Sequence, residues 1–278
     1  MFQRIVVPLD GSCLAEWALP HAINLVNALG IQLVLIRVME QAENNRSLYP
    51  PDPIACDAMQ AEARAYLDSV ASRLGGLGIH PETRILEGET VDQIISFVRQ
   101  DGHTLLVMTS HGVGGISHYM LGSVAHKSIL QAHVSFLLVR AFNDQCQALQ
   151  EYHYNRITVP LDGSSRSECV LPIVELLSRH NDSTVDLVSI VPSLVHQYQI
   201  DKHDHRLSNI QELQTELKEK IDGYLDCIGD RLRNESLHVQ RQVRISDSPM
   251  SAIWEATRKG RSDLVIMAAH GRNCVSHW

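Results

Sequence analysis

The chain repeats part of its own sequence almost unchanged. Residues 4–12 read Arg-Ile-Val-Val-Pro-Leu-Asp-Gly-Ser and return as residues 156–164, with one difference among the nine positions. A second pair, residues 105–112 and 264–271, is similar at an offset of 159 rather than 152. A duplication with a seven-residue change in length explains both offsets. The 278 residues are therefore expected to form two copies of one unit rather than a single large domain.

Each unit alternates between strand-like and helix-like sequence. Short runs of apolar and β-branched residues predict strands that are buried on both faces, and the stretches between them have helical periodicity. This pattern predicts an α/β fold with a parallel sheet covered by helices. In unit 1 we expect strands at 4–9, 32–38, 81–86, 104–109 and 135–140, helices at 14–29, 58–74, 91–99 and 123–132, and a loop at 47–57. In unit 2 we expect strands at 156–161, 184–191, 238–245 and 263–268, and a long helix at 210–232.

The two units are expected to be unequal. Domain 1 is assigned to residues 1–141, a polar, Gln-rich linker to 142–154, and domain 2 to 155–278. Unit 1 continues 29 residues beyond His111 to Arg140, whereas only 8 residues follow His270. The second domain is therefore expected to lack its last helix and strand. We expect either a partner that covers this side of it or a shortened chain.

The composition limits the classes of partner. Against 24 basic residues the chain has 32 acidic ones, a formal net charge of −8, which disfavours nucleic acid and anionic membranes as partners. No apolar run approaches the roughly 18 residues of a membrane-spanning helix, and the N-terminus lacks the pattern of a signal peptide. The six cysteines form no Cys-x-x-Cys pair, so we expect reduced thiols and no zinc site. Together these features predict a cytoplasmic protein.

Two segments at predicted strand ends carry groups that suit a nucleotide. Asp10 follows the first strand, and its carboxylate can accept hydrogen bonds from ribose hydroxyls or an adenine amino group. Gly122 and Ser123 open a predicted helix, where exposed N–H groups favour phosphate. In open parallel sheets, ligands bind beyond the carboxyl ends of the strands where the strand order reverses. These residues therefore predict a nucleotide site.

Other kinds of chemistry have no support in the sequence. There is no Gly-x-Ser-x-Gly elbow and no Gly-x4-Gly-Lys-Ser/Thr loop, so no catalytic residue is assigned and any ATP hydrolysis is expected to be slow and incidental. The histidines at 103, 111, 118, 126 and 133 fall on different kinds of element, so no metal site is assigned. Simpler roles remain open for the candidate residues: Asp10 as a helix cap only, Gly122 and Ser123 as an ordinary helix start, and His111 as a loop histidine held by backbone hydrogen bonds.

Residues 8–12 and 110–124 resemble the universal stress protein family in its UspA-like form. ATP-binding members of that family carry the motif Gly-x2-Gly-x9-Gly-Ser/Thr. Gly112, nine intervening residues, and Gly122 followed by Ser123 match the later part of the motif, whereas Thr109 stands at the first glycine. The resemblance extends over essentially the whole chain as a tandem pair.

The resemblance implies two Rossmann-like domains with a five-stranded parallel sheet of order 3-2-1-4-5. It also implies ATP, or ADP or AMP, as ligand, with Mg²⁺ or Mn²⁺ at the phosphates. Carried over by position, the binding residues are Pro8 and Asp10 at base and ribose, Val38 at adenine, Met108 and Thr109 at the ribose, and Gly112, Gly122, Ser123 and Val124 at the phosphates. In unit 2, Asp162, Ile190 and Gly271 match Asp10, Val38 and Gly112, while Ala268 replaces the first glycine.

The leading hypothesis is that domain 1 binds the nucleotide as a signal for conformation or association in a stress response. Domain 2 is then a degenerate structural partner in an intrachain pseudo-dimer, with a homodimer as a further state. One alternative is a nucleotide-free dimerisation or interaction module in which Thr109 closes the site. Another is a slow ATPase or an adenylyl-transferring relative on the same fold.

Overall fold

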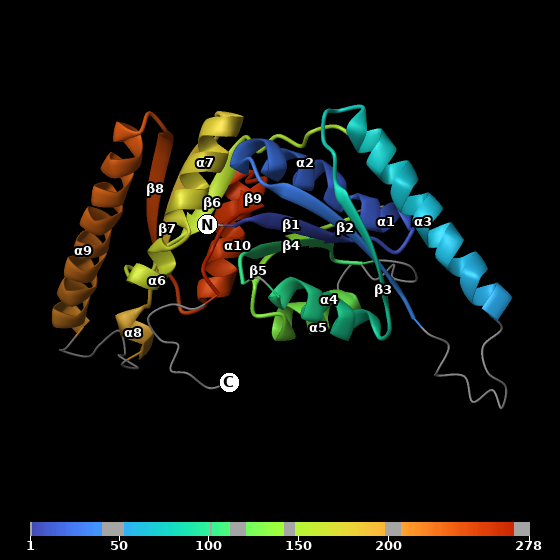
Figure 1. Ribbon diagram of the computed structural model, residues 1–278. Helices are drawn as coiled ribbons and strands as arrows, with labels where there is room; N and C mark the ends of the chain where they lie inside the picture. Colours follow the sequence, from blue (N-terminus) through green and yellow to red (C-terminus); the bar gives the residue numbers. More distant parts are fainter. Residues whose placement is uncertain are drawn as a thin grey trace. The chain divides into compact units, whose positions relative to one another are not determined.

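In a computed structural model, the chain forms two compact α/β units, Met1–Tyr152 and His153–Trp278. The structure describes residues 2–40, 53–100, 102–111, 121–141, 148–197 and 207–269. Each unit contains its own parallel sheet (Figure 1). The repeat in the sequence is therefore a repeat in the fold.

The sheet of unit 1 has five parallel strands in the order β3-β2-β1-β4-β5, which confirms the expected 3-2-1-4-5 arrangement. β1 lies between β2 and β4, so the strand order reverses beside it. This reversal is where an open parallel sheet offers a ligand site. The strands are β1 Arg4–Pro8, β2 Gln32–Met39, β3 Glu82–Glu87, β4 Thr104–Thr109 and β5 Ser135–Val139.

Helices cover both faces of this sheet (Figure 1). The first three helices lie on one face, and α4 and α5 pack against each other on the other. The helices are α1 Cys13–Glu16, α2 Ala18–Leu29, α3 Pro53–Gly75, α4 Thr90–Arg99 and α5 Ser123–Gln131.

Two expected boundaries are wrong, and proline is involved in both. The helix expected at 14–29 is interrupted at Trp17, because Pro20 has no N–H to donate to the carbonyl four residues earlier. Pro172 occupies the corresponding place in unit 2, where α6 Ser165–Glu168 and α7 Leu171–Asn181 are likewise separate helices. α3 begins at Pro53, inside the loop expected at 47–57, because the first turn of a helix tolerates proline.

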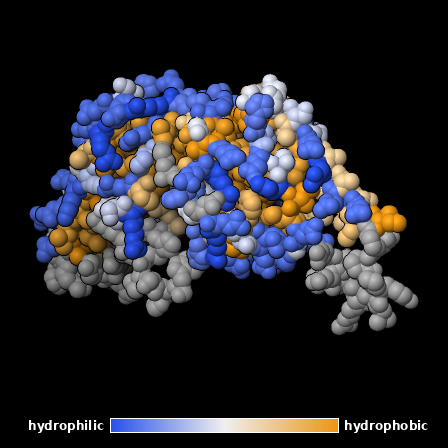
Figure 2. Space-filling model, viewed as in Figure 1, coloured by the Kyte–Doolittle hydropathy of each residue, from blue (hydrophilic) through white to orange (hydrophobic). Residues whose placement is uncertain are grey.

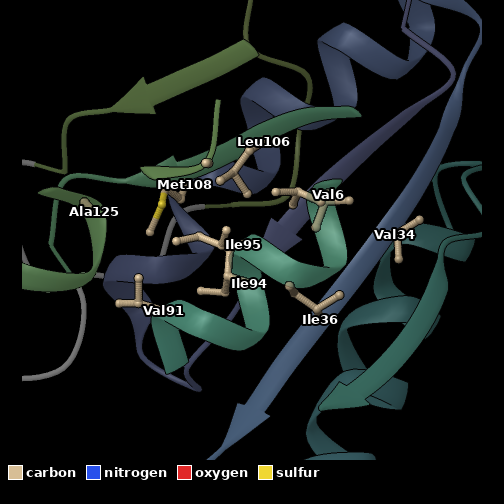
Figure 3. Packing of buried hydrophobic residues seen from close by; sticks show 11 residues of the cluster. Val6, Val34, Ile36, Val91, Ile94, Ile95, Leu106, Met108 and Ala125 are labelled. Carbon is tan, nitrogen blue, oxygen red and sulfur yellow. The ribbon is translucent and has the colours of Figure 1, made fainter. Parts of the chain in front are cut away.

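The core between the sheet and α4 is a continuous apolar cluster. Strand residues such as Val6, Ile36 and Leu106 face α4, whose Ile94 and Ile95 point toward them (Figure 3). Ala125 of α5 and Ala132, which caps the C-terminus of that helix, belong to the same cluster. α5 is therefore fixed to the sheet through small residues that allow close packing against α4.

Unit 2 repeats this architecture with four strands in the part of the chain that the structure describes. The parallel sheet has the order β8-β7-β6-β9, which corresponds to 3-2-1-4 in unit 1. The strand expected at 263–268 is shorter in the structure, where β9 comprises only Leu264–Val265. Among the described residues, β9 pairs only with β6. The remaining elements are β6 Arg156–Pro160, β7 Thr184–Val191, α8 Leu194–Gln197, α9 Leu207–Asn234, β8 His238–Ile245, α10 Pro249–Gly260 and β9 Leu264–Val265.

Parts of the expected linker at 142–154 pack into the units that they join. Within unit 1, Glu151 accepts hydrogen bonds from Asn24 and Asn27, and Tyr152 stacks on His21 with ring centroids 4.3 Å apart. Within unit 2, Tyr154 is fully buried. The contacts on either side of Tyr152 therefore place the change of unit between Tyr152 and His153.

Hydrophilic side chains cover most of the face shown in Figure 2, with apolar patches between them. No helix in the described ranges is both long enough and apolar enough to cross a membrane. Cys56, Cys169 and Cys227 are free thiols, as expected. Cys13 is disulfide-bonded, so the expectation of reduced thiols is wrong at that position.

Candidate functional site

The turn after β1 is held by the side chain of Asp10. Ser12 donates its backbone N–H and its hydroxyl to Asp10 Oδ1, at 2.9 and 2.6 Å. Between them, Gly11 has φ +89°, a conformation that favours glycine. Ser12 is the N-cap of α1 and accepts a hydrogen bond from the N–H of Ala15 at 3.1 Å. The expectation that Asp10 itself could be the helix cap is therefore wrong, because Asp10 orients the residue that caps.

Unit 2 contains the same turn with the same hydrogen bonds. Ser164 donates its N–H and its hydroxyl to Asp162 Oδ1 at 2.9 and 2.6 Å. Gly163 has φ +78°, close to the value of Gly11. The Asp-Gly-Ser turn is thus an element of the repeated fold and does not by itself distinguish a ligand-binding unit.

The end of β4 meets the start of α5 in unit 1. Gly122 is the N-cap of α5, and its N–H donates to the carbonyl of Ser110 at 2.8 Å. A Cβ at Gly122 would lie 3.0 Å from the same carbonyl oxygen, so the close approach depends on glycine. The first N–H groups of an α-helix have no carbonyl partner within the helix, and those of α5 begin at this edge of the sheet.

Thr109 and His111 shape the segment between these two elements. The Thr109 hydroxyl donates to the carbonyl of His111 at 2.7 Å, and Thr109 is buried. The Nδ1 atom of His111 lies 3.1 Å from the Ser110 hydroxyl, while its Nε2 is buried without a hydrogen-bond partner in the described structure. An unpartnered polar atom in a buried position is costly unless something binds it.

The remaining expected site residues fall at the same edge of the sheet. Val38 and Val124 pack against the apolar cluster to which Met108 belongs, so these three residues of β2, α5 and β4 share one surface. Pro8 ends β1 and is half-buried, and Ser123, the first residue of α5, is exposed. Gly112 lies outside the described residues.

A group of interacting side chains beside the Asp10 turn was not expected from the sequence. Glu16 of α1 is buried, and its carboxylate accepts from the Tyr66 hydroxyl at 3.1 Å and forms an ion pair with Arg73 at 2.9 Å. The Arg37 guanidinium lies 5.2 Å from the centroid of the Tyr66 ring. A Cβ at Gly11 would be 3.4 Å from Nη1 of Arg37, so this cation lies next to the turn.

Burial, together with the neighbouring Glu16 carboxylate, raises the pKa of the Tyr66 hydroxyl above its usual value. The hydroxyl is therefore a hydrogen-bond donor throughout the physiological range. Unit 2 repeats the pair: the Tyr224 hydroxyl donates to Glu168 at 3.0 Å, and burial likewise raises the pKa of Tyr224. The Glu–Tyr pair occupies corresponding positions in both units. A comparison of the two repeats in the sequence could therefore have predicted it.

No group of three or more His, Cys, Asp or Glu side chains in the described ranges is placed to hold a metal ion.

The Universal stress protein family model matches residues 1–140 and 153–278. Among curated relatives, Universal stress protein YxiE of Bacillus subtilis is 27% identical over 148 residues, covering 50% of this chain and 100% of the relative. Universal stress protein MJ0531 of Methanocaldococcus jannaschii is 28% identical over 147 residues, covering 50% of this chain and 83% of the relative. These single relatives each match about half of the chain.

Two solved structures match nearly the full length of this chain. A universal stress protein from Archaeoglobus fulgidus has a TM-score of 0.64 at 15% identity, covering 95% of this chain and 85% of the other. Protein PA1789 of Pseudomonas aeruginosa, described as functionally unknown, has a TM-score of 0.62 at 12% identity, covering 98% and 84%. At such low sequence identities, the similarity to these two structures shows a shared fold only. The family match over both halves and the two repeated sheets lead to one conclusion: this chain is a tandem member of the universal stress protein family.

Proposed function

We propose that unit 1 binds an adenine nucleotide, ATP or its relatives ADP and AMP, and that binding serves as a signal for conformation or association in a stress response. The observation that carries the proposal is the meeting of the Asp10 turn and the Gly122 helix start at one sheet edge. β1 and β4 are neighbouring parallel strands, so the two features follow adjacent carboxyl ends. The strand order reverses there, as in other nucleotide-binding sheets.

The described groups fit the chemistry of a nucleotide. Asp10 supplies a carboxylate acceptor for hydroxyl or amino groups, the backbone of Val38 offers a contact for adenine, and the half-buried Pro8 lies near base and ribose. Ser123 and the residues after it at the start of α5 supply N–H donors for phosphate, while Gly122 allows the close approach to the Ser110 carbonyl. This suits an acidic chain, because no basic side chain is required. Mg²⁺ or Mn²⁺ would be held chiefly by the phosphate oxygens.

Thr109 is the departure from the family motif that bears most directly on this proposal. Its hydroxyl is hydrogen-bonded to the His111 carbonyl, so the polar end of the side chain is directed to the protein itself. We infer that the Thr109 side chain reduces the space for the ribose without blocking it. The competing hypothesis, a nucleotide-free interaction module, requires that the same side chain block the site.

Unit 2 is assigned a structural role in the same proposal. It retains the Asp162 turn, but Ala268 stands at the first glycine of the motif, and the counterpart of Gly112 lies outside the described residues. We propose that units 1 and 2 associate as an intrachain pseudo-dimer and that nucleotide in unit 1 biases this association. No catalytic role is assigned to either unit.

The proposal is tested by measuring the thermal shift and the Kd for ATP with Mg²⁺ on the full chain. In Gly122→Asp, the new side chain meets the Ser110 carbonyl and repels phosphate, so we expect at least about a tenfold loss of affinity. Gly223→Asp is the matched control, because it adds the same charge on α9 where a Cβ meets nothing within 4 Å. Absence of ATP binding by the wild-type chain would favour the nucleotide-free module.

A further inference from the structure

One cation beside the Asp10 turn is not neutralised by the part of the chain that the structure describes. The Arg37 guanidinium of β2 is half-buried, and it makes no hydrogen bond or ion pair with any described residue. It lies against the ring of Tyr66 and next to the turn at Gly11. Removing a charge from water is costly unless an opposite charge compensates for it. Arg37 is therefore suited to an anion that a ligand brings.

The position of this cation is fixed by a series of contacts that leads into the core. The guanidinium lies 5.2 Å from the centroid of the Tyr66 ring, within the range of a cation–π interaction. The Tyr66 hydroxyl donates to Glu16 at 3.1 Å, and Glu16 forms its ion pair with Arg73 at 2.9 Å. The Arg37 cation is thus held in place before a ligand binds, which lowers the entropic cost of binding.

Unit 2 repeats this neighbourhood without the cation. β1 and β2 pair in the same register as β6 and β7, at a constant offset of 152 residues. That offset places Ser189, which is 2% exposed, at the position of Arg37. Tyr224 keeps its hydrogen bond to Glu168, and the charges that act on its hydroxyl are the carboxylates of Glu168 and Asp162. Arg37 therefore belongs only to the unit for which nucleotide binding is proposed.

Arg37 and Gly122 lie on opposite sides of the Asp10 turn. Arg37 belongs to β2 and Gly122 follows β4, and β1 lies between these two strands. Neighbouring strands are about 4.8 Å apart, so β2 and β4 are separated by roughly 10 Å. A nucleotide with its 5′-phosphate at the start of α5 and its ribose at Asp10 would therefore direct the 2′ and 3′ oxygens of the sugar toward the Arg37 side.

We propose that Arg37 makes unit 1 selective for adenine nucleotides that carry a second phosphate on the ribose, at the 2′ or the 3′ oxygen. The inference rests on the nucleotide site proposed above and specifies its ligand. The guanidinium binds the ribose phosphate through parallel N–H donors, a geometry that suits phosphate. Asp10 accepts a hydrogen bond from the ribose hydroxyl that remains. Dinucleotide-binding sheets likewise use a carboxylate for a ribose hydroxyl and an arginine for a ribose phosphate.

Matched ligands isolate the contribution of the ribose phosphate. AMP is compared with 3′-phosphoadenosine 5′-phosphate and 2′-phosphoadenosine 5′-phosphate, which differ from AMP only by that group. The Kd of the full chain for each is measured by calorimetry at constant ionic strength, because salt screens phosphate contacts. We expect one of the two bisphosphates to bind at least about tenfold more tightly than AMP, the scale of a hydrogen bond between charged groups. The net charge of −8 opposes this order, so general attraction for phosphate does not explain it.

Variants distinguish the cation from its surroundings. Arg37→Gln should bring the Kd values for AMP and the preferred bisphosphate to within about twofold of each other. Arg37→Lys should give a preference between those of wild type and Arg37→Gln, because the charge remains and the paired donors are lost. Arg84→Gln is the matched control: it removes the same charge from β3, where Arg84 pairs with Glu82, and should keep the full preference. Thermal melting shows whether each variant folds.

Two results would overturn the proposal. The first is a wild-type chain that binds AMP as tightly as both bisphosphates. The second is a preference that Arg37→Gln retains, because another group would then bind the ribose phosphate. Either result leaves the nucleotide site itself in place. If the folded wild-type chain binds neither ATP, AMP nor the bisphosphates, the proposed function fails, and the selectivity fails with it.

Discussion

Asp10 and Asp162 make the same pair of hydrogen bonds to the serine two residues later, yet we assign them different roles. Their local geometry holds the start of a helix in both units. The neighbourhood is what differs, because Asp10 follows β1, which lies next to β4, the strand that leads to Gly122. The function of this carboxylate therefore depends on a segment more than a hundred residues away in the sequence.

Replacing the two aspartates separately should distinguish these roles. Asp10→Ala and Asp162→Ala each remove the same local hydrogen bonds, so each should lower the free energy of unfolding by about 1 kcal/mol. The Kd for ATP should rise at least about tenfold in Asp10→Ala and change less than about twofold in Asp162→Ala, as measured by calorimetry. An equal effect of both substitutions would mean that the turn acts only through stability.

Thr109→Gly restores the family motif in unit 1. Removing the side chain should widen the ribose position and lower the Kd for ATP by up to about tenfold, the scale of one side-chain contact. The loss of the hydrogen bond to the His111 carbonyl should lower the free energy of unfolding by about 1 kcal/mol or more. An unchanged or weaker affinity would show that Thr109 does not restrict the site.

His21 should make the stability of unit 1 depend on pH. Burial lowers the pKa of His21 from 6.5 to about 4. Between these two values the unfolded chain binds a proton that the folded chain does not, so the free energy of unfolding falls as the pH falls. The slope is at most about 1.4 kcal/mol per pH unit, and smaller to the extent that water reaches the ring.

Chemical unfolding at pH 7 and pH 5 measures this effect. His21→Phe keeps an aromatic ring to stack on Tyr152 and removes the titrating group, so it should lose less stability between the two pH values than wild type. His238→Gln is the control, because the His238 side chain is 72% exposed and is not part of the His21–Tyr152 stack. Equal losses in wild type and His21→Phe would contradict the prediction.

At the scale of elements, Glu16 of α1 joins this helix to α3 through its contacts with Tyr66 and Arg73. The Glu16 side chain is 7% exposed, and its ion pair with Arg73 compensates for burying the carboxylate. Arg73→Ala should lower the free energy of unfolding by roughly 1–3 kcal/mol because Glu16 keeps only the Tyr66 hydroxyl among the partners described above. Arg84→Ala is the matched control: the Arg84 side chain is 59% exposed in its pair with Glu82, so its removal should cost less than about 1 kcal/mol. Similar losses in a urea unfolding series would contradict this distinction.

The order of the strands could be predicted from the sequence, because two repeats of alternating strands and helices, together with the family resemblance, leave few topologies. Helix boundaries near Pro20 and Pro53 could not, since proline ends a helix in one context and begins one in another. The residues around Asp10 likewise include some that the sequence could predict and some that it could not. Asp10 and Gly122 lie in recognisable motifs, whereas Arg37 and Tyr66 come together only through tertiary packing.

At the scale of the whole molecule, the two units share a fold and differ in what surrounds it. In unit 1, α5 both covers the core cluster and provides the helix start at Gly122. One element therefore serves packing and the proposed phosphate site together. Nucleotide binding is accordingly proposed for unit 1.

The central claim is one nucleotide site per chain, located in unit 1. Isothermal titration calorimetry of the full chain with ATP and Mg²⁺ tests it most directly. We predict a stoichiometry of one, lost in Gly122→Asp and retained in Asp162→Ala. Two equivalent sites, no measurable binding by the wild-type chain, or a single site that survives Gly122→Asp would contradict the assignment.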